Sequence, residues 1–518
     1  MDKKPKSVFK NASKKYTTTL SRHGYRIPKK EFTDKELENL KKELMATPFM
    51  DGAPSVAQNI IKPFPIYFES VENIYLPRYW GQKYFGMPLN NRLKNDQPYQ
   101  MNSNIKFKGA LRPYQQTIVD VYLKAAKEIG GGIISIGCGR GKTVIGICIA
   151  ASLGLKTLVV VHKEFLATQW EERIMTFLPN AQVGRIQGKV IDVYKKDIVI
   201  AMVQSLSQKQ YSDLTFQDFG LVIFDECHHL SAEIFSRALI KTGSRHTLGL
   251  SATPFRKDNL TYVFKTFLGD IIYKEDSNED NTVLVKAIHY FNDDPNYCNE
   301  LANRMGDLNR PQIINNICSC TKRNKVILDE LKELIMEGRK ILFLSDRREH
   351  LCYIKEEISS NIPEATSGLY VGGMKQDDLK VSEDCDIILG TYSMVSEGFD
   401  CPSLDTIILG SPKSDVVQSV GRILRKKPED RDRQHMVLDI IDSFANFGRS
   451  WKTRSKFYKK QAFQIEQYTY DDNSIRTLIK EGAPPPRKHK TMKEEIEEID
   501  FIDFKEDPDQ VDFTEEKD

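Results

Sequence analysis

The chain has 518 residues, of which 40% are hydrophobic and 28% charged, and its formal net charge is +3. A chain of this length and apolar content can supply the cores of about three domains. No stretch has the apolar length that spans a bilayer, and no apolar signal core follows the N-terminus, so we do not expect a membrane protein. The nine cysteines are scattered, which is typical of reduced thiols.

Residues 1–108 predict a basic arm followed by an N-terminal accessory domain. The arm is rich in lysine to about Tyr25, and TDKELENLKKELMAT at 33–47 has the pattern of a helix. Pro, Tyr and Phe are frequent from there to Lys108. Recognition of DNA structure, binding of a partner and bracing of the next domain all fit this composition, and the sequence does not choose among them.

A glycine-rich loop, GCGRGKT, follows the β-branched run GGIISI and precedes a helical pattern at 143–154. This context predicts a P-loop that places nucleotide phosphates at a helix N-terminus. Lys142 would meet the β and γ oxygens and Thr143 would hold Mg²⁺, so ATP and Mg²⁺ are the expected cofactors. The loop residues expected to contact the nucleotide are Gly137, Cys138, Gly139, Arg140, Gly141, Lys142 and Thr143. Ile136 replaces the usual first glycine, and an ordinary strand-to-helix turn is the alternative for this motif taken alone.

The apolar run LVIFD predicts a strand that carries Asp225 and Glu226 at its C-terminal end. An open α/β sheet binds its ligand at this end of its strands. Asp225 would complete the Mg²⁺ shell, and Glu226 would orient and deprotonate the attacking water. A helix N-cap with an acidic first turn is the alternative. The Cys-His-His run that follows has no second ligand pair with metal spacing, so we do not expect zinc.

Two series of alternating strands and helices predict an α/β fold with two tandem recombinase-like P-loop lobes. The first series, at about 109–270, contains the strand patterns TLVVV, DIVIAMV, LVIFD and TLGLS. The second, at about 315–443, contains KILFLSD, CDIILGTY, TIILGSP and HMVLDIID. Residues 271–314 are expected to connect the lobes, with the ATP cleft between them.

Two further segments follow the second lobe. The extension at 444–483 mixes aromatic rings such as Trp451 and Phe457 with basic residues, which suits base stacking and phosphate contact. Docking of the rings against the second lobe is the alternative. We expect an acidic, disordered tail at 484–518, because residues 493–518 hold thirteen acidic residues against three lysines, a net charge of −10. The rest of the chain then carries +13, which suits a phosphate backbone.

Six segments in fixed order, GCGRGKT, DECHH, SAT, LSDR, EGFD and QSVGRILR, resemble the motifs of superfamily-2 helicases of the DExH type. The resemblance runs from about Leu111 to Tyr458. Four longer segments make the chain similar to the xeroderma pigmentosum group B type and its phage and large-DNA-virus relatives: LRPYQQ, VVVHKEFLATQW, GLSATPFRKD and GRKILFLSDRREHL. Lys257 replaces the glutamate of an Arg-Glu-Asp element of that type, so the role of the element is not transferred.

The resemblance implies roles for residues beyond the loop and the acidic pair. Arg112 and Gln115 would read the adenine, and Gly398 with Asp400 would link the nucleotide to the nucleic-acid strand. The residues expected to couple hydrolysis to the grip on nucleic acid are His228, Ser251, Ala252 and Thr253. The expected catalytic residues are Lys142, Asp225, Glu226, Gln418, Arg422 and Arg425. The two arginines are three positions apart, so both can reach the γ-phosphate from one helical face.

We interpret the chain as an ATP-dependent helicase or translocase that moves along or unwinds nucleic acid, with DNA favoured over RNA. The alternatives are a duplex-DNA translocase, annealing motor or transcript-release factor without strand separation, and an ATP-gated clamp with little turnover. The intact set of catalytic residues argues against the clamp. We expect a soluble, intracellular protein of the nucleus, the cytoplasm or a viral factory, whose acidic tail screens the basic track, binds a protein partner or is simply solvated.

Overall fold

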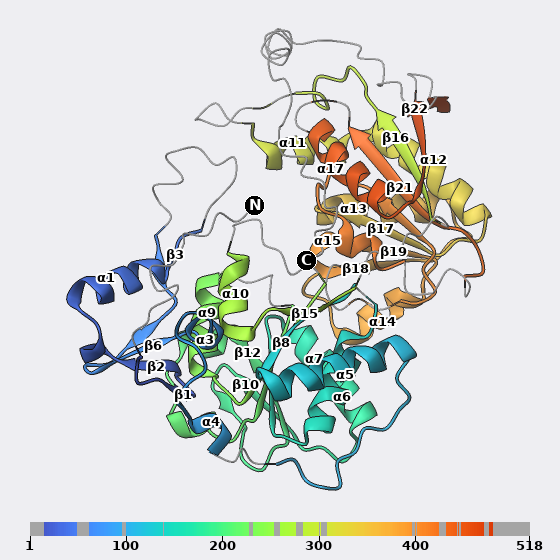
Figure 1. The fold of residues 1–518 in the computed structure, drawn as a ribbon. Coiled ribbons are helices and arrows are strands. Elements are labelled where there is room, and N and C mark those ends of the chain that lie inside the picture. Colours follow the sequence, from blue (N-terminus) through green and yellow to red (C-terminus); the bar gives the residue numbers. More distant parts are fainter. Residues whose placement is uncertain are drawn as a thin grey trace, which may run out of the picture.

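The chain folds around two large parallel sheets, each covered by helices on both faces (Figure 1). The computed structural model describes residues 15–48, 62–95, 100–137, 139–226, 232–252, 260–275, 283–299, 301, 308–395, 399, 401–423, 431–442, 444, 447–470 and 476–479. The predicted α/β class with two parallel-sheet lobes is confirmed. The acidic tail predicted from residue 484 onward lies outside the described residues.

The first lobe contains an eight-stranded sheet with the order β11-β10-β12-β9-β13-β14-β8-β15. All of its pairings are parallel except β10 with β11. The strands are β8 (Gly131–Ser135), β9 (Thr157–Val161), β10 (Val183–Gln187), β11 (Val190–Ile191), β12 (Ile198–Met202), β13 (Leu221–Asp225), β14 (His246–Ser251) and β15 (Ile271–Lys274). The helices are α5 (Pro113–Glu128), α6 (Lys142–Leu153), α7 (Glu164–Phe177), α8 (Val203–Gln208), α9 (Ala232–Lys241) and α10 (Thr261–Leu268), with a 3-10 turn at Asp213–Thr215.

The continuous apolar runs of this lobe form its central strands because both faces of the sheet are buried. Strand β13 shows the division: Leu221 and Ile223 point into one core, and Val222 and Phe224 into the other. The first core is closed by α5, α6 and α7, and the second by α8, α9 and α10. All five residues of β13 are buried, which leaves only its carboxyl end to present polar groups.

The second lobe repeats the plan with the order β18-β19-β17-β20-β21-β16-β22-β23, parallel except for β22 with β23. Its strands are β16 (Val283–Tyr290), β17 (Ile341–Ser345), β18 (Ser367–Tyr370), β19 (Ile387–Thr391), β20 (Thr406–Leu409), β21 (His435–Asp442), β22 (Gln464–Tyr470) and β23 (Arg476–Ile479). Its helices are α11 (Arg310–Ser319), α12 (Thr321–Met336), α13 (Arg348–Asn361), α14 (Gln376–Asp384), α15 (Tyr392–Val395), α16 (Val417–Val420) and α17 (Phe447–Lys460).

The range 271–314, expected only to connect the lobes, supplies one strand to each sheet. Strand β15 pairs with β8 of the first lobe, and β16 lies between β21 and β22 of the second. Strand β15 of the first sheet and β16 of the second are therefore consecutive described strands of the chain. The extension at 444–483 likewise belongs to the second sheet, because β22 pairs with β16 and β23 pairs with β22.

The N-terminal region forms a smaller five-stranded sheet with the order β5-β6-β2-β1-β7 and a two-stranded sheet of β3 and β4. The strands are β1 (Thr19–Ser21), β2 (Gly24–Pro28), β3 (Met45–Ala46), β4 (Phe64–Pro65), β5 (Phe68–Glu69), β6 (Asn73–Leu76) and β7 (Asn90–Asn91). The helices are α1 (Asp34–Glu43), α3 (Arg78–Phe85) and α4 (Arg92–Asn95), with a 3-10 turn at Lys29–Glu31. The expected helix at 33–47 is shorter, since Thr33 caps it and the chain turns into β3 after Leu44.

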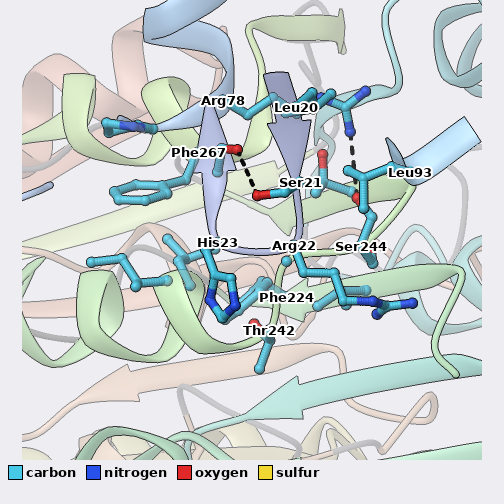
Figure 2. A pocket seen from close by; sticks show the side chains of 17 residues that line it. Leu20, Ser21, Arg22, His23, Arg78, Leu93, Phe224, Thr242, Ser244 and Phe267 are labelled. Carbon is cyan, nitrogen blue, oxygen red and sulfur yellow. Dashed lines mark hydrogen bonds between the residues drawn. The ribbon is translucent and has the colours of Figure 1, made fainter. Parts of the chain in front are cut away.

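This N-terminal sheet shares its core with the first lobe. Tyr25, Leu40 and Trp80 pack in one cluster with Leu260 and Val263, the latter on α10. The β1–β2 hairpin also borders a pocket on the first lobe, where Arg22 and His23 face Thr242 and Ser244 (Figure 2). The sequence left three roles open for this region: recognition of DNA structure, binding of a partner and bracing of the next domain. These contacts support bracing of the first lobe.

Hydrogen bonds also join the N-terminal region to the first lobe. Arg78 donates to the carbonyl of Arg245 at 2.8 Å, and the hydroxyls of Tyr79 and Thr247 lie 2.8 Å apart. Arg22 donates to the carbonyl of Phe216 at 2.6 Å.

Within the part of the chain that the structure describes, no helix is long and apolar enough to cross a membrane.

Candidate nucleotide site

The glycine-rich loop lies between the carboxyl end of β8 and the first residue of α6. Gly139 and Gly141 have φ values of 75° and 81°, a left-handed conformation that glycine adopts without a Cβ clash. Gly141 is the N-cap of α6, so Lys142 begins the helix and Thr143 follows it. The loop therefore combines left-handed glycines with a helix N-terminus, a geometry that can bind an anion.

Strand order brings the acidic pair to this loop. The sequence β13-β14-β8 places the ends of these three strands side by side, with Asp225 opposite Leu250 and Ser251 opposite Ser135. Asp225 is the last residue of β13, and Glu226 follows it with a φ of 47°. A left-handed conformation at a residue with a Cβ costs about 1 kcal/mol or more, and such strain gathers at functional sites.

The two chemical groups that the sequence assigned to phosphate and to water are in direct contact. The Lys142 ammonium lies 2.5 Å from Oε1 of Glu226, and the two side chains are only 11% and 12% exposed. In this sheltered position the attraction is screened less than on the surface. A phosphate oxygen that binds the Lys142 ammonium would have to compete with the Glu226 carboxylate. Phosphate binding and release of Glu226 would therefore be coupled.

Asp225 is held by the backbone of Glu226 and by Trp170, a residue that the sequence analysis did not assign to the site. The Trp170 indole N–H donates to Oδ2 of Asp225 at 2.8 Å, and the backbone N–H of Glu226 donates to Oδ1 at 3.0 Å. Burial, and then the charge of Glu226, raise the pKa of Asp225 to about 6. Trp170 stands in a segment already quoted for the resemblance, but only the fold brings α7 against the end of β13.

Helix α5 is hydrogen-bonded to the glycine-rich loop at Arg140. Gln115 donates through Nε2 to the carbonyl of Arg140 at 3.1 Å, and the Tyr114 hydroxyl donates to the same carbonyl at 3.1 Å. The Arg112 backbone N–H donates to Oε1 of Gln115 at 3.0 Å, which fixes the amide. Gln115 is therefore tied to the phosphate loop, and its assignment to adenine stays a prediction.

Glu275 is a loop contact that the sequence did not point to. Its Oε2 accepts from the backbone N–H of Gly137 at 2.9 Å, and its Oε1 accepts from Arg140 Nε at 2.5 Å. Its own backbone N–H donates to the carbonyl of Ser135 at 2.8 Å. Glu275 follows β15 directly, at the start of the segment that joins the lobes. A single glutamate after a strand carries no motif, so no sequence signal marked it.

Two of the residues expected to couple hydrolysis to nucleic-acid binding, Ser251 and Ala252, are described, and they lie beside the glycine-rich loop. Ser251 ends β14, is fully buried, and accepts the backbone N–H of Ile136 at 3.1 Å through its carbonyl. Ala252 follows it. Six other expected site residues lie outside the described residues: Cys138, His228, Thr253, Gly398, Asp400 and Arg425.

The described arginine of QSVGRILR is turned into its own lobe. Arg422 is buried and donates through Nη1 to the carbonyl of Phe399 at 2.9 Å. Gln418 lies on α16. The lobes meet where Lys163 Nζ, after β9, donates to the carbonyl of Ser393, after β19, at 3.5 Å. The structure thus gathers Lys142, Thr143 and the acidic pair on the first lobe, and keeps Arg422 on the second.

The fold and the site define a P-loop enzyme with two parallel-sheet lobes. A family model described as "Type III restriction enzyme, res subunit" matches residues 108–256, which cover most of the first lobe. A fragment of a putative HsdR subunit of a type I restriction enzyme from Vibrio vulnificus has a similar fold, with a TM-score of 0.50 at 15% identity over 72% of this chain and 71% of that chain.

Viral proteins are similar along most of the chain. "Putative ATP-dependent RNA helicase L396" of Acanthamoeba polyphaga mimivirus is 36% identical over 467 residues, which cover 89% of this chain and 88% of the relative. "Putative helicase 161L" of Invertebrate iridescent virus 6 is 25% identical over 77% of this chain and 90% of the relative. The chain belongs to this family of viral ATP-dependent helicases. It is an ATP-hydrolysing helicase that acts on nucleic acid, as predicted.

Proposed function

We propose that the chain is a DNA helicase or translocase in which Lys142 binds the phosphates of ATP, Asp225 binds Mg²⁺ and Glu226 activates water. The observation that carries this proposal is the meeting of the three residues at the carboxyl edge of β8 and β13, with Lys142 and Glu226 2.5 Å apart. Phosphoryl transfer depends mainly on positioning and charge stabilisation, which these groups supply.

Thr143 and Asp225 are the proposed protein ligands of Mg²⁺. The ion prefers oxygen ligands and usually keeps water and substrate phosphates in its shell, so one hydroxyl and one carboxylate are sufficient. Asp225 suits the role because it is buried and its carboxylate is oriented by Trp170 and by the Glu226 backbone. When bound, the ion neutralises charge on the β and γ phosphates.

The contacts of the chain support an order of events. The phosphates draw Lys142 away from Glu226, and the released carboxylate is then available to orient and deprotonate a water molecule. Arg422 exchanges the carbonyl of Phe399 for the γ-phosphate when the lobes close. Hydrolysis then weakens both contacts and lets the lobes separate, which moves the enzyme along its strand.

DNA is the proposed track because the matching family model is described for a restriction enzyme subunit, a class of enzyme that acts on DNA. RNA is the second candidate, since the mimivirus relative is named an RNA helicase. A duplex translocase without strand separation uses the same site. We also propose that the protein acts inside the cell. The acidic residues at 493–518 would bind a protein partner.

The test is steady-state phosphate release from ATP with no polynucleotide, single-stranded DNA, duplex DNA, forked DNA or RNA. We expect DNA to stimulate release more than RNA does, and the best DNA to identify strand or duplex tracking. RNA-led stimulation would replace DNA by RNA as the track. ATP binding without stimulation by any polynucleotide would overturn the proposal. Strand displacement on a tailed duplex then separates a helicase from a translocase.

A further inference from the structure

Helix α17 separates its aromatic rings from most of its basic residues. Phe447 and Tyr458 are buried, and Trp451 and Phe457 pack against the core of the second lobe. The rings therefore dock against the lobe and are not free to stack on bases. Of the two interpretations of this extension in the sequence, the structure supports docking for the rings.

Buried polar bonds fix the rotation of α17 about its axis. Arg454 makes a two-pronged ion pair with Asp439, in which Nε and Nη2 each donate at 2.8 Å. The Tyr458 hydroxyl donates to the same carboxylate at 3.0 Å. Paired bonds of this kind impose a definite geometry as well as attraction. The opposite side of α17 is consequently held toward solvent in one orientation.

That outer side carries a row of cations, which we call the α17 basic face: Arg449, Lys452, Lys456, Lys459 and Lys460, all exposed. Their spacing of three and four positions places them along one stripe of the helix. The helix contains no Asp or Glu. Within the described residues, none of the five side chains forms an ion pair.

Such a row is unfavourable unless an anion faces it. Like charges three or four positions apart destabilise an isolated helix by about 0.2–0.5 kcal/mol per pair. At 1.5 Å per residue, the row from Arg449 to Lys460 is about 17 Å long. A nucleic-acid strand carries a phosphate about every 3.4 Å along its axis, so the row can face several phosphates at once.

The position of α17 connects the row to the helicase motifs. Arg454 donates to the backbone carbonyl of Lys413, and the Lys413 ammonium lies 3.0 Å from Asp346 of the LSDR segment. Arg310 of α11 donates to the Ser450 hydroxyl at 3.1 Å. The helix is therefore anchored at the edge of the second lobe that presents LSDR, and a strand held at that edge can continue across α17.

We propose that the α17 basic face is a binding surface for the phosphate backbone of the nucleic acid. This proposal rests on the proposed function, because it assigns a further contact to the same substrate. The contact is independent of base sequence, since the rings of α17 pack against the lobe and its exposed charges are all basic. Its affinity must depend steeply on salt, because phosphate neutralisation releases counterions.

The test compares two full-length triple variants. Lys452→Gln, Lys456→Gln and Lys459→Gln together remove three charges from the α17 basic face. The control removes three exposed lysines from α12 of the same lobe: Lys322→Gln, Lys325→Gln and Lys332→Gln. Anisotropy of labelled single-stranded DNA gives the dissociation constant from 50 to 200 mM salt, and the melting temperature checks folding.

We expect the α17 variant to bind about tenfold or more weakly at low salt. The slope of log affinity against log salt should fall by roughly two, at about 0.7 for each lost phosphate contact with a single strand. The control should keep the wild-type slope. An unchanged slope in the α17 variant would overturn the proposal. Tighter binding would also overturn it. Failure of the wild-type chain to bind any polynucleotide would instead contradict the proposed function.

Discussion

The indole nitrogen of Trp170, on α7, lies 2.8 Å from a carboxylate oxygen of Asp225 at the end of β13. The two residues are 55 positions apart, and both are buried. A hydrogen bond to an ionised group contributes about 1.5–3 kcal/mol, and here it orients the proposed Mg²⁺ ligand. The ATPase site is thus supported by a residue that has no charge of its own.

Trp170→Phe should lower kcat/KM for Mg·ATP by about tenfold or more, because it removes the N–H donor while keeping most of the ring. Affinity for ATP measured without Mg²⁺ should change much less. Steady-state phosphate release and nucleotide titrations give the two quantities. Trp451→Phe, which alters packing in the second lobe, is the control. Equal losses with and without Mg²⁺ would argue against a role through Asp225.

Glu226→Gln should retain ATP binding and lose hydrolysis by several orders of magnitude. The amide removes both the base and the ion pair with Lys142, so ATP affinity should be equal to or higher than that of the wild type. Lys142→Ala should lose turnover together with ATP affinity. Binding of a fluorescent ATP analogue and single-turnover hydrolysis separate the two effects. Wild-type turnover in either variant would refute the assigned roles.

Glu275→Gln should raise KM for ATP several-fold, because its carboxylate fixes the loop through Gly137 and Arg140. The expected cause is a less ordered loop, so kcat at saturating ATP should change less than KM. Asp270→Asn is a matched control, since Asp270 is 83% exposed and pairs with Lys265 at 3.6 Å. A change in kcat alone would point away from loop positioning.

Gly243→Ala should detach the N-terminal sheet from the first lobe. A Cβ at residue 243 would lie 1.8 Å from the carbonyl oxygen of Arg22, and a backbone atom cannot move aside cheaply. We expect faster proteolysis within residues 15–95 and a lower melting temperature. Gly372→Ala, whose Cβ would meet nothing within 4 Å, should leave both unchanged. Wild-type protease resistance in Gly243→Ala would contradict the tight contact.

We expect acid to lower the stability of the second lobe, because the buried ring of His350 stays neutral in the folded state. Its ring contacts Ser345 at 3.0 Å and Asn324 at 3.1 Å, and burial, followed by the charge of Arg323, lowers its pKa from 6.5 to about 3. The unfolded chain then binds more protons between these values, so the stability from the neutral ring is present above pH 6.5 and is lost as pH falls.

His350→Asn removes this titration, so its loss of stability between pH 7 and pH 5 should be smaller than that of the wild type by about 2 kcal/mol. Urea unfolding at the two pH values measures the difference. His23→Asn is the control, because His23 is exposed and lies in the N-terminal hairpin. A wild-type pH dependence in the His350 variant would mean that the ring does not control the acid response.

The sequence by itself determined the class of fold, and it predicts the chemistry of the nucleotide site. Continuous β-branched runs favour strands buried on both faces, and a glycine-rich loop between a strand and a helix favours phosphate binding at the helix N-terminus. Lys142 and the Asp225–Glu226 pair are therefore predicted from local pattern, and their roles stay predictions. The domain ranges, the adenine contact and the arginines that would reach the γ-phosphate stay predictions.

Only the tertiary structure decided which groups touch across the sheet. Trp170 and Glu275 reach the site because strand order, which no local pattern records, places α7 beside β13 and β15 beside β8. The same applies to α17: its sequence mixes rings and cations, and packing against the second lobe decides that the rings are buried and the cations exposed. Burial and long-range contact depend on the whole fold, so they are the properties that a local motif cannot specify.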